Sequence, residues 1–207
     1  MKKYIWEQIQ KSWKSIYDWN ISCAKINVIV DEPEFGWFDI TLSSSDGRMF
    51  VFSISEVYSP LENIRDMLKG WFFKDGVMSI QIDCELYKII IGMMPTNVYK
   101  KNSSVEYGVL NCFLKIDSQD EVDKVVADDS LVAVVEIEQF ALSIYSAFKT
   151  RILTSQAILE DPESWREEDL IEEYYDNKIT SEEYREELFN RYMKIPDFER
   201  ILDSSQQ

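Results

Sequence analysis

The chain has 207 residues, of which 45% are hydrophobic and 14% aromatic, so a disordered protein is excluded and one domain with a real core is expected. Its 38 acidic and 22 basic residues give a net charge of −16, which disfavours nucleic acid and anionic membrane as partners and favours a basic protein. The chain has no histidine, so histidine-dependent nucleophiles and histidine-ligated metals are excluded.

The charge is concentrated in the second half of the chain. Residues 1–100 carry 13 acids and 11 bases, whereas residues 101–207 carry 25 acids and 11 bases. This asymmetry indicates either a binding surface for a basic partner or acidity that serves solubility alone, and the sequence leaves both open.

The N-terminal segment predicts an amphipathic helix. Ile5, Ile9, Trp13 and Ile16 recur at helical spacing, and polar residues separate them. Because these polar residues interrupt the apolar stretch, we expect neither a secretory signal nor a membrane span. The three cysteines, Cys23, Cys84 and Cys112, are far apart and set among apolar residues, which is typical of a reducing compartment. We therefore predict a cytoplasmic protein.

Three strands are predicted next, at residues 24–30, 37–42 and 49–54. Asp46-Gly47 lies between the second and third and is a strong hairpin signal. The expected pairing sets Phe38, Ile40 and Leu42 against Phe50, Phe52 and Ile54, with one apolar face toward a helix.

The segment from Ser59 to Met94 predicts a helix lying on an antiparallel sheet. Pro60 suits the first helical position, Ser59 and Glu62 form a capping box, and Gly70 fits the residue that ends a helix. Two strands follow, at residues 77–84 and 86–94.

The chain from residue 107 to residue 155 alternates between strands and helices. We predict a strand at 107–116, a short helix at 118–127 that opens with a second capping box, and a strand at 131–137. Phe140, Ile144 and Phe148 recur every four residues and predict a long helix at about 138–155.

Residues 156–207 hold 16 acids against 6 bases and have a helical pattern throughout. Asp161-Pro162 starts one helix, and the Thr180–Glu183 capping box starts the next. We predict an αα-hairpin with a short tail. The chain therefore divides into an α+β domain (1–155), with an antiparallel sheet of about six strands and helices on one face, and an acidic helical extension (156–207) packed on that domain.

No catalytic signature is evident. Asp83 and Glu85 form the best carboxylate pair, but Asp-x-Glu is ordinary chemistry at a hairpin end, so a hydrolase-like enzyme is an alternative only. The acids around Asp117 lack the glycine and the terminal glutamate of a calcium loop. We predict a non-catalytic protein without metal or cofactor. A structural or adaptor protein that dimerises through residues 5–16 is a further alternative, and the oligomeric state is open.

Two acidic fields are the predicted partner-binding surface. Acids four residues apart on a helix repel one another, so an isolated helix gains nothing from them and a basic partner would relieve the repulsion. Glu182, Glu183, Glu186 and Glu187 repeat the pattern on the next segment. The residues predicted to bind a basic protein partner are Asp120, Asp123, Asp128, Asp129, Glu163, Glu167, Glu168, Glu172 and Glu173.

Parts of the chain resemble a group of bacterial proteins. The run 59–68 followed by 82–85, and the strand 132–138 leading into the helix 140–148, resemble uncharacterised bacterial proteins that include immunity proteins of polymorphic toxin systems. The resemblance covers residues 36–155 and excludes the acidic tail. It implies a cytoplasmic, non-catalytic protein that binds and blocks a toxin, such as a basic nuclease.

Overall fold

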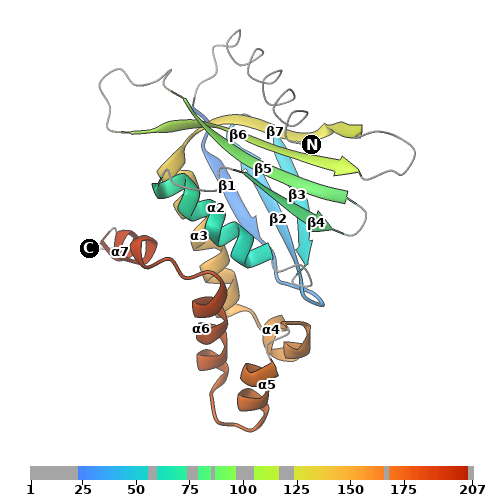
Figure 1. The fold of residues 1–207 in the computed structure, drawn as a ribbon, viewed down its shortest axis with the longest axis vertical. Coiled ribbons are helices and arrows are strands. Elements are labelled where there is room, and N and C mark those ends of the chain that lie inside the picture. The colour runs from blue at the N-terminus through green and yellow to red at the C-terminus, as the bar shows by residue number, and fades with distance from the viewer. Residues whose placement is uncertain are drawn as a thin grey trace.

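The computed structural model describes residues 23–55, 60–73, 79–84, 87–96, 105–116, 124–165 and 168–204. These residues form an α+β fold with two antiparallel sheets and a set of helices, shown in Figure 1. The fold class is confirmed. The predicted N-terminal amphipathic helix lies outside the described residues.

The first sheet has the order β1-β2-β3, with β1 at Ile26–Val30, β2 at Trp37–Ser44 and β3 at Met49–Ser55. Gly47 has a φ of 89°, a conformation that L side chains rarely adopt, and it completes the turn that joins β2 to β3. The register pairs Phe38 with Ile54 and Ile40 with Phe52, as the alternation predicts. The hairpin prediction is therefore confirmed.

The second sheet has the order β4-β5-β6-β7, with β4 at Ser79–Cys84, β5 at Tyr87–Thr96, β6 at Tyr107–Ile116 and β7 at Lys124–Glu136. The prediction of one sheet of about six strands is wrong, since the strands in the described residues, seven in number, form two sheets. Each hydrogen-bonded pair joins strands adjacent in sequence, and helix α2 (Pro60–Phe73) interrupts that succession between β3 and β4.

Two local predictions also fail. Helix α2 does not end at Gly70 but continues to Phe73, because Trp71 is 1% exposed and stacks on Phe140 with ring centroids 5.9 Å apart. The short helix at 118–127 is contradicted where the structure describes it, because β7 begins at Lys124. Val125 there pairs with Lys115 of β6, and its β-branched side chain favours a strand.

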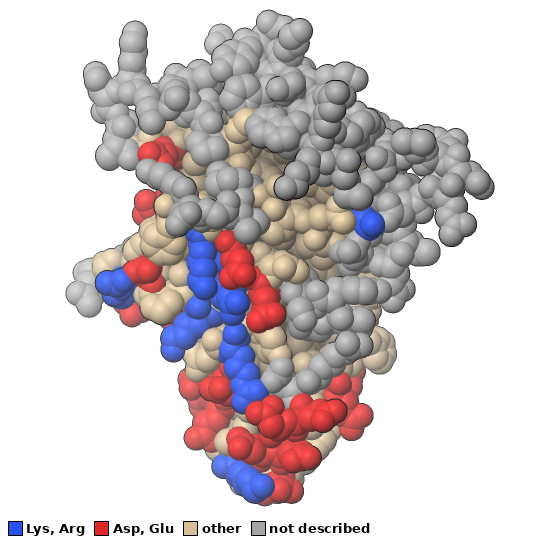
Figure 2. Space-filling model, viewed as in Figure 1, with Lys and Arg blue, Asp and Glu red and all other residues tan. Residues whose placement is uncertain are grey.

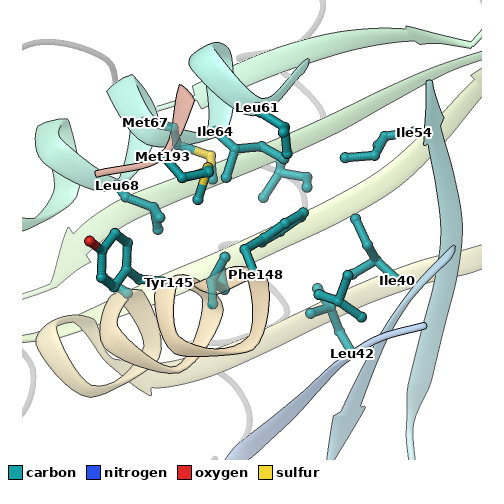
Figure 3. Close-up of a cluster of buried hydrophobic side chains, with 14 of the residues drawn as sticks. Ile40, Leu42, Ile54, Leu61, Ile64, Met67, Leu68, Tyr145, Phe148 and Met193 are labelled. Atoms are coloured by element: carbon teal, nitrogen blue, oxygen red, sulfur yellow. The ribbon is translucent and has the colours of Figure 1, made fainter. Parts of the chain in front are cut away.

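Helices α2 and α3 (Ile137–Thr154) face each other across the centre of the hydrophobic core. Figure 3 shows Leu61, Ile64, Met67 and Leu68 of α2 directed toward Tyr145 and Phe148 of α3, with Ile40, Leu42 and Ile54 of the first sheet beside them. Phe148 is 1% exposed and lies edge-on to Phe38 of β2, at a centroid distance of 5.8 Å. The long helix predicted from the four-residue recurrence is confirmed.

The C-terminal region is a series of short helices: α4 (Ala157–Glu160), the 3₁₀ helix η2 (Pro162–Trp165), α5 (Glu168–Tyr175), α6 (Ser181–Tyr192) and α7 (Pro196–Ser204). Helices α5 and α6 form the predicted hairpin, at the end of the molecule farthest from the strand labels in Figure 1. Its buried residues belong to the same hydrophobic cluster as the sheets. Within the described part of the chain, no helix combines the length and the apolar composition needed to cross a bilayer.

Candidate functional site

The acidic hairpin, defined as residues 162–192, begins its second helix with a complete capping box. The Thr180 hydroxyl accepts a hydrogen bond from the Glu183 amide at 3.2 Å, and the Glu183 carboxylate accepts one from the Thr180 amide at 2.7 Å. The hydrogen bonds from Thr180, the backbone one first, hold the pKa of Glu183 below its ordinary value. The predicted capping box is therefore confirmed, and it fixes where the chain reverses.

The hairpin is held on the body of the protein by its apolar face. Leu170, Tyr184, Leu188 and Phe189 are buried, and Trp165 lies 5.1 Å from Phe38 between ring centroids. At the edge of this contact the Arg185 guanidinium donates to the Ser155 carbonyl at 3.2 Å. All of this packing is on one side, so the opposite side of the hairpin faces solvent.

The outward side is acidic. The carboxylates of six exposed glutamates have no hydrogen bond or ion pair to another described residue, although Lys178 lies near enough to two of them, Glu172 and Glu173, to interact with their charges. The six are Glu163, Glu168, Glu172, Glu173, Glu182 and Glu186. Figure 2 shows acidic side chains dominating this end of the molecule. Carboxylates that form no such bond within the protein are available to a basic partner.

Other acids of the hairpin are already paired. Asp169 accepts two hydrogen bonds from Arg191, both at 3.0 Å, and Glu187 accepts a third from the same guanidinium at 3.1 Å. The hydrogen bond from Arg191 is the main reason that the pKa of Asp169 lies below its ordinary value. Asp169 thereby joins α5 to α6, whereas Glu187 pairs with Arg191 within α6. Both acids therefore differ from the six glutamates, whose carboxylates have no such pair.

A hollow of about 300 Å³ lies between α5 and α6. Leu170 and Ile179 supply its apolar lining, and Glu173 and Glu186 stand among the acids at its border. A lysine or arginine side chain has an apolar stem and a charged tip, so this combination matches it chemically. Arg191 also lines the hollow, but its guanidinium is bonded to Asp169 and Glu187.

The structure separates the two predicted acidic fields. Glu168, Glu172 and Glu173 are exposed on α5, and Glu163 is exposed on η2. The backbone of Asp128 and Asp129 belongs to β7, in the second sheet, which Figure 1 shows far from α5. Asp120, Asp123 and Glu167 lie outside the described residues, as do the side chains of Asp128 and Asp129.

Glu186 was not among the predicted partner-binding residues, although it borders the same hollow as Glu173. The signal for it was present in the sequence as the i, i+4 spacing of Glu182 and Glu186. What the sequence lacked was the packing of α6 beside α5, which brings acids of both helices to one surface.

The other residues considered for catalysis or metal binding add no second site within the described part of the chain. The side chains of Asp83 and Glu85 lie outside the described residues. Among the described residues, no three acidic or cysteine side chains gather in a way that would hold a metal ion. Cys112 is buried, and burial raises the pKa of its thiol above the ordinary value, whereas Cys23 is exposed.

One further carboxylate has a structural role at the junction of the body and the C-terminal region. Glu32 accepts hydrogen bonds from the Ser155 hydroxyl at 2.6 Å and from the amides of Gln156 and Ala157 at 2.8 and 3.1 Å, and it forms an ion pair with Arg151. Burial alone would raise the pKa of Glu32, but the hydrogen bonds together outweigh it and lower the pKa.

We compared the chain with models of known protein families, with curated proteins and with solved structures, and nothing matches in any of the three comparisons. A function therefore has to be argued from the geometry of the acidic hairpin itself.

Proposed function

We propose that this chain is a non-catalytic, cytoplasmic protein-binding domain whose acidic hairpin engages a basic protein partner, in the manner of an immunity-type inhibitor that blocks a toxin. The single observation that carries the proposal is the set of six exposed glutamates whose carboxylates form no ion pair or hydrogen bond within the described part of the chain. The class of partner is taken from the expected resemblance of residues 36–155 to immunity proteins, a stretch that does not include the hairpin.

Electrostatics gives the proposal its physical content. Glu168 and Glu172, like Glu182 and Glu186, lie four residues apart on one helix, where like charges destabilise the free helix. A basic partner removes that repulsion on binding. The net charge of −16 also steers a cationic protein toward the surface and repels nucleic acid, so association is expected to be fast and sensitive to salt.

The test uses the purified product of the adjacent gene as the probe. We expect calorimetric titration to give a complex whose affinity falls steeply as salt rises from about 50 to 500 mM, because screening shortens the reach of exposed charges. Duplex DNA serves as a polyanionic probe and is expected not to bind.

A pair of charge reversals locates the surface. Glu173→Lys with Glu186→Lys is expected to lower the affinity by about tenfold or more, since both residues border the hollow. The control Glu138→Lys with Glu160→Lys makes the same charge change at two exposed residues outside the acidic hairpin. Equal weakening by both pairs, or binding that ignores salt, would remove the support for this surface.

A further inference from the structure

Strand β1 borders the first sheet, with β2 on one side and no strand on the other among the described residues. The residues that flank β1 show which of its backbone groups face β2. The Ser45 amide donates to the Lys25 carbonyl at 3.0 Å, and the Asp31 amide donates to the Asp39 carbonyl at 2.9 Å. In an antiparallel pair these bonds recur at every second residue, so the odd-numbered residues of β1 are the ones bonded to β2.

The even-numbered residues therefore direct their amides and carbonyls away from the sheet. Both ends of this outer edge agree with that assignment. The Ala24 amide donates to the Val134 carbonyl of β7 at 2.8 Å, and the Val30 carbonyl accepts from the Arg151 guanidinium at 2.8 Å. Between these two bonds lie Ile26 and Val28, whose backbone groups have no partner among the described residues.

The outer edge of β1 opens into a groove of about 630 Å³, whose second wall is helix α3. That wall consists mainly of small, uncharged side chains at helical spacing: Ser143, Ser146, Ala147 and Thr150. The Ser143 hydroxyl donates to the Gln139 carbonyl within α3, at 2.8 Å, so it does not need a hydrogen-bond acceptor from a ligand. The small side chains leave room beside β1 for another chain.

We propose that an extended segment of a partner protein, about five residues long, adds to β1 as the fourth strand of the first sheet. Its backbone pairs with the amides and carbonyls of Ile26 and Val28, because only an extended chain presents donors and acceptors with that spacing. Its inward side chains are small and uncharged, because they lie against Ser143, Ser146 and Ala147 of α3.

A second copy of this chain is a poorer occupant of the groove. Each copy carries a net charge of −16, and pairing β1 with β1 would bring two such molecules together. A partner of opposite charge meets no such repulsion. The inference does not depend on the acidic hairpin, since no hairpin residue lines the β1 groove and the one charged residue in its lining, Arg151, is already paired with Glu32.

The probe is the uncharged peptide acetyl-STVTVTS-amide, in which valines alternate with hydroxyl residues. We expect its addition to the full chain to slow hydrogen exchange at the amides of Ile26 and Val28, while the amides of Asn27 and Ile29, already bonded to β2, change little. Because the peptide is uncharged, the affinity is expected to vary less than about twofold between 50 and 500 mM salt. Failure of the acidic hairpin to bind a basic protein would leave this result unaffected.

Two methylated peptides test the geometry on the unmodified protein. N-methylation of the peptide amides in one alternating phase is expected to abolish binding, and methylation in the other phase to preserve it, because only one phase faces β1. Equal effects of the two phases would overturn the proposal. The proposal would also be overturned if the amides of Ile26 and Val28 are already protected from exchange in the free protein. Dimerisation through β1, or the absence of binding at millimolar peptide, would overturn it as well.

A substitution in the helical wall adds a second line of evidence. Ser146→Arg is expected to fill the β1 groove and weaken peptide binding at least tenfold. The control Thr154→Arg places the same side chain on α3 at an exposed position that does not line the groove, and it is expected to bind as the unmodified protein does. If Ser146→Arg does not fold, the methylated peptides still decide the question.

Discussion

The sheet-and-helix body (residues 24–155) and the acidic hairpin use side chains in opposite ways. In the body, α2 and α3 close a core of aliphatic and aromatic residues against two sheets. In the hairpin, a single apolar face docks on the body, and most of the exposed side chains that the structure describes there are charged. Stability is therefore concentrated in the body, and the capacity to recognise a charged partner is concentrated in the hairpin.

This division has a physical cause. Burying apolar area contributes about 25 cal/mol per Å², so elements that bury both faces contribute most to folding. Exposed ion pairs contribute little, because water screens them. The charges of the hairpin can therefore be arranged for a partner with little cost to the fold, and the largest effects of mutation on stability belong to the body.

Phe148→Ala is expected to show the largest loss of stability. The ring is 1% exposed and extends from α3 into the core between α2 and the first sheet, so its removal leaves a cavity and costs about 3 to 5 kcal/mol. Chemical denaturation followed by circular dichroism measures the change. The matched control is Phe73→Ala, which removes a ring that is 47% exposed. Similar losses for the two variants would contradict the placement of the core.

Glu32→Gln is expected to cost about 1 kcal/mol at pH 7, because the carboxylate joins the body to the start of α4 but is partly screened by solvent. Its pKa is lowered in the folded protein, so its contribution is fully present above the ordinary value of about 4.3 and is lost as pH falls through the folded value. The difference between the unmodified protein and the variant is therefore expected to shrink below about pH 4. A difference that is constant from pH 7 to pH 3 would show that the charge of Glu32 is not involved.

The sequence predicts those parts of the fold whose signals are local. Asp46-Gly47 specified the β2–β3 turn and, with the alternation on each side, the register of that hairpin. Thr180 and Glu183 specified the start of α6, because both partners of the capping box lie within four residues. The recurrence of Phe140, Ile144 and Phe148 specified α3 in the same way.

The failures arise from contacts between distant residues. Gly70 has the local signature of a helix end, but the burial of Trp71 against Phe140 of α3 keeps α2 helical for three more residues. Residues 124–130 have a helix-start signal before them, yet they belong to β7, and Lys124, Val125 and Ser130 pair with β6. The separation into two sheets has no local signal at all.

The same limit applies to the candidate site. The acids of α5 could be chosen from their spacing alone, but Glu186 joins them only because α6 packs beside α5. The groove between β1 and α3 was missed for a related reason. Its small residues recur at helical spacing on α3, and their meaning depends on a strand more than a hundred residues earlier in the chain.

Thr180→Ala tests how much of the hairpin's order comes from its own capping box. The variant removes the hydroxyl that accepts from the Glu183 amide and is expected to cost about 0.5 to 1 kcal/mol. Thr180→Ser retains an acceptor at the same place and is the control. Hydrogen exchange at the first turn of α6 is expected to rise in the alanine variant only. Unchanged exchange there would mean that packing on the body alone sets the start of α6.

Asp169→Asn is expected to have the smallest effect on stability, even though Asp169 forms a two-bond pair with Arg191. The pair is exposed to solvent, so water and salt already screen most of its attraction. Its hydrogen bonds lower the pKa of Asp169, so any contribution is present at neutral pH and lost in acid. We expect denaturation curves of the variant and the unmodified protein to differ slightly in low salt and to coincide in high salt. A loss as large as that of Thr180→Ala, persisting in high salt, would mean that charge pairing holds the hairpin together and that the division between body and hairpin is drawn too sharply.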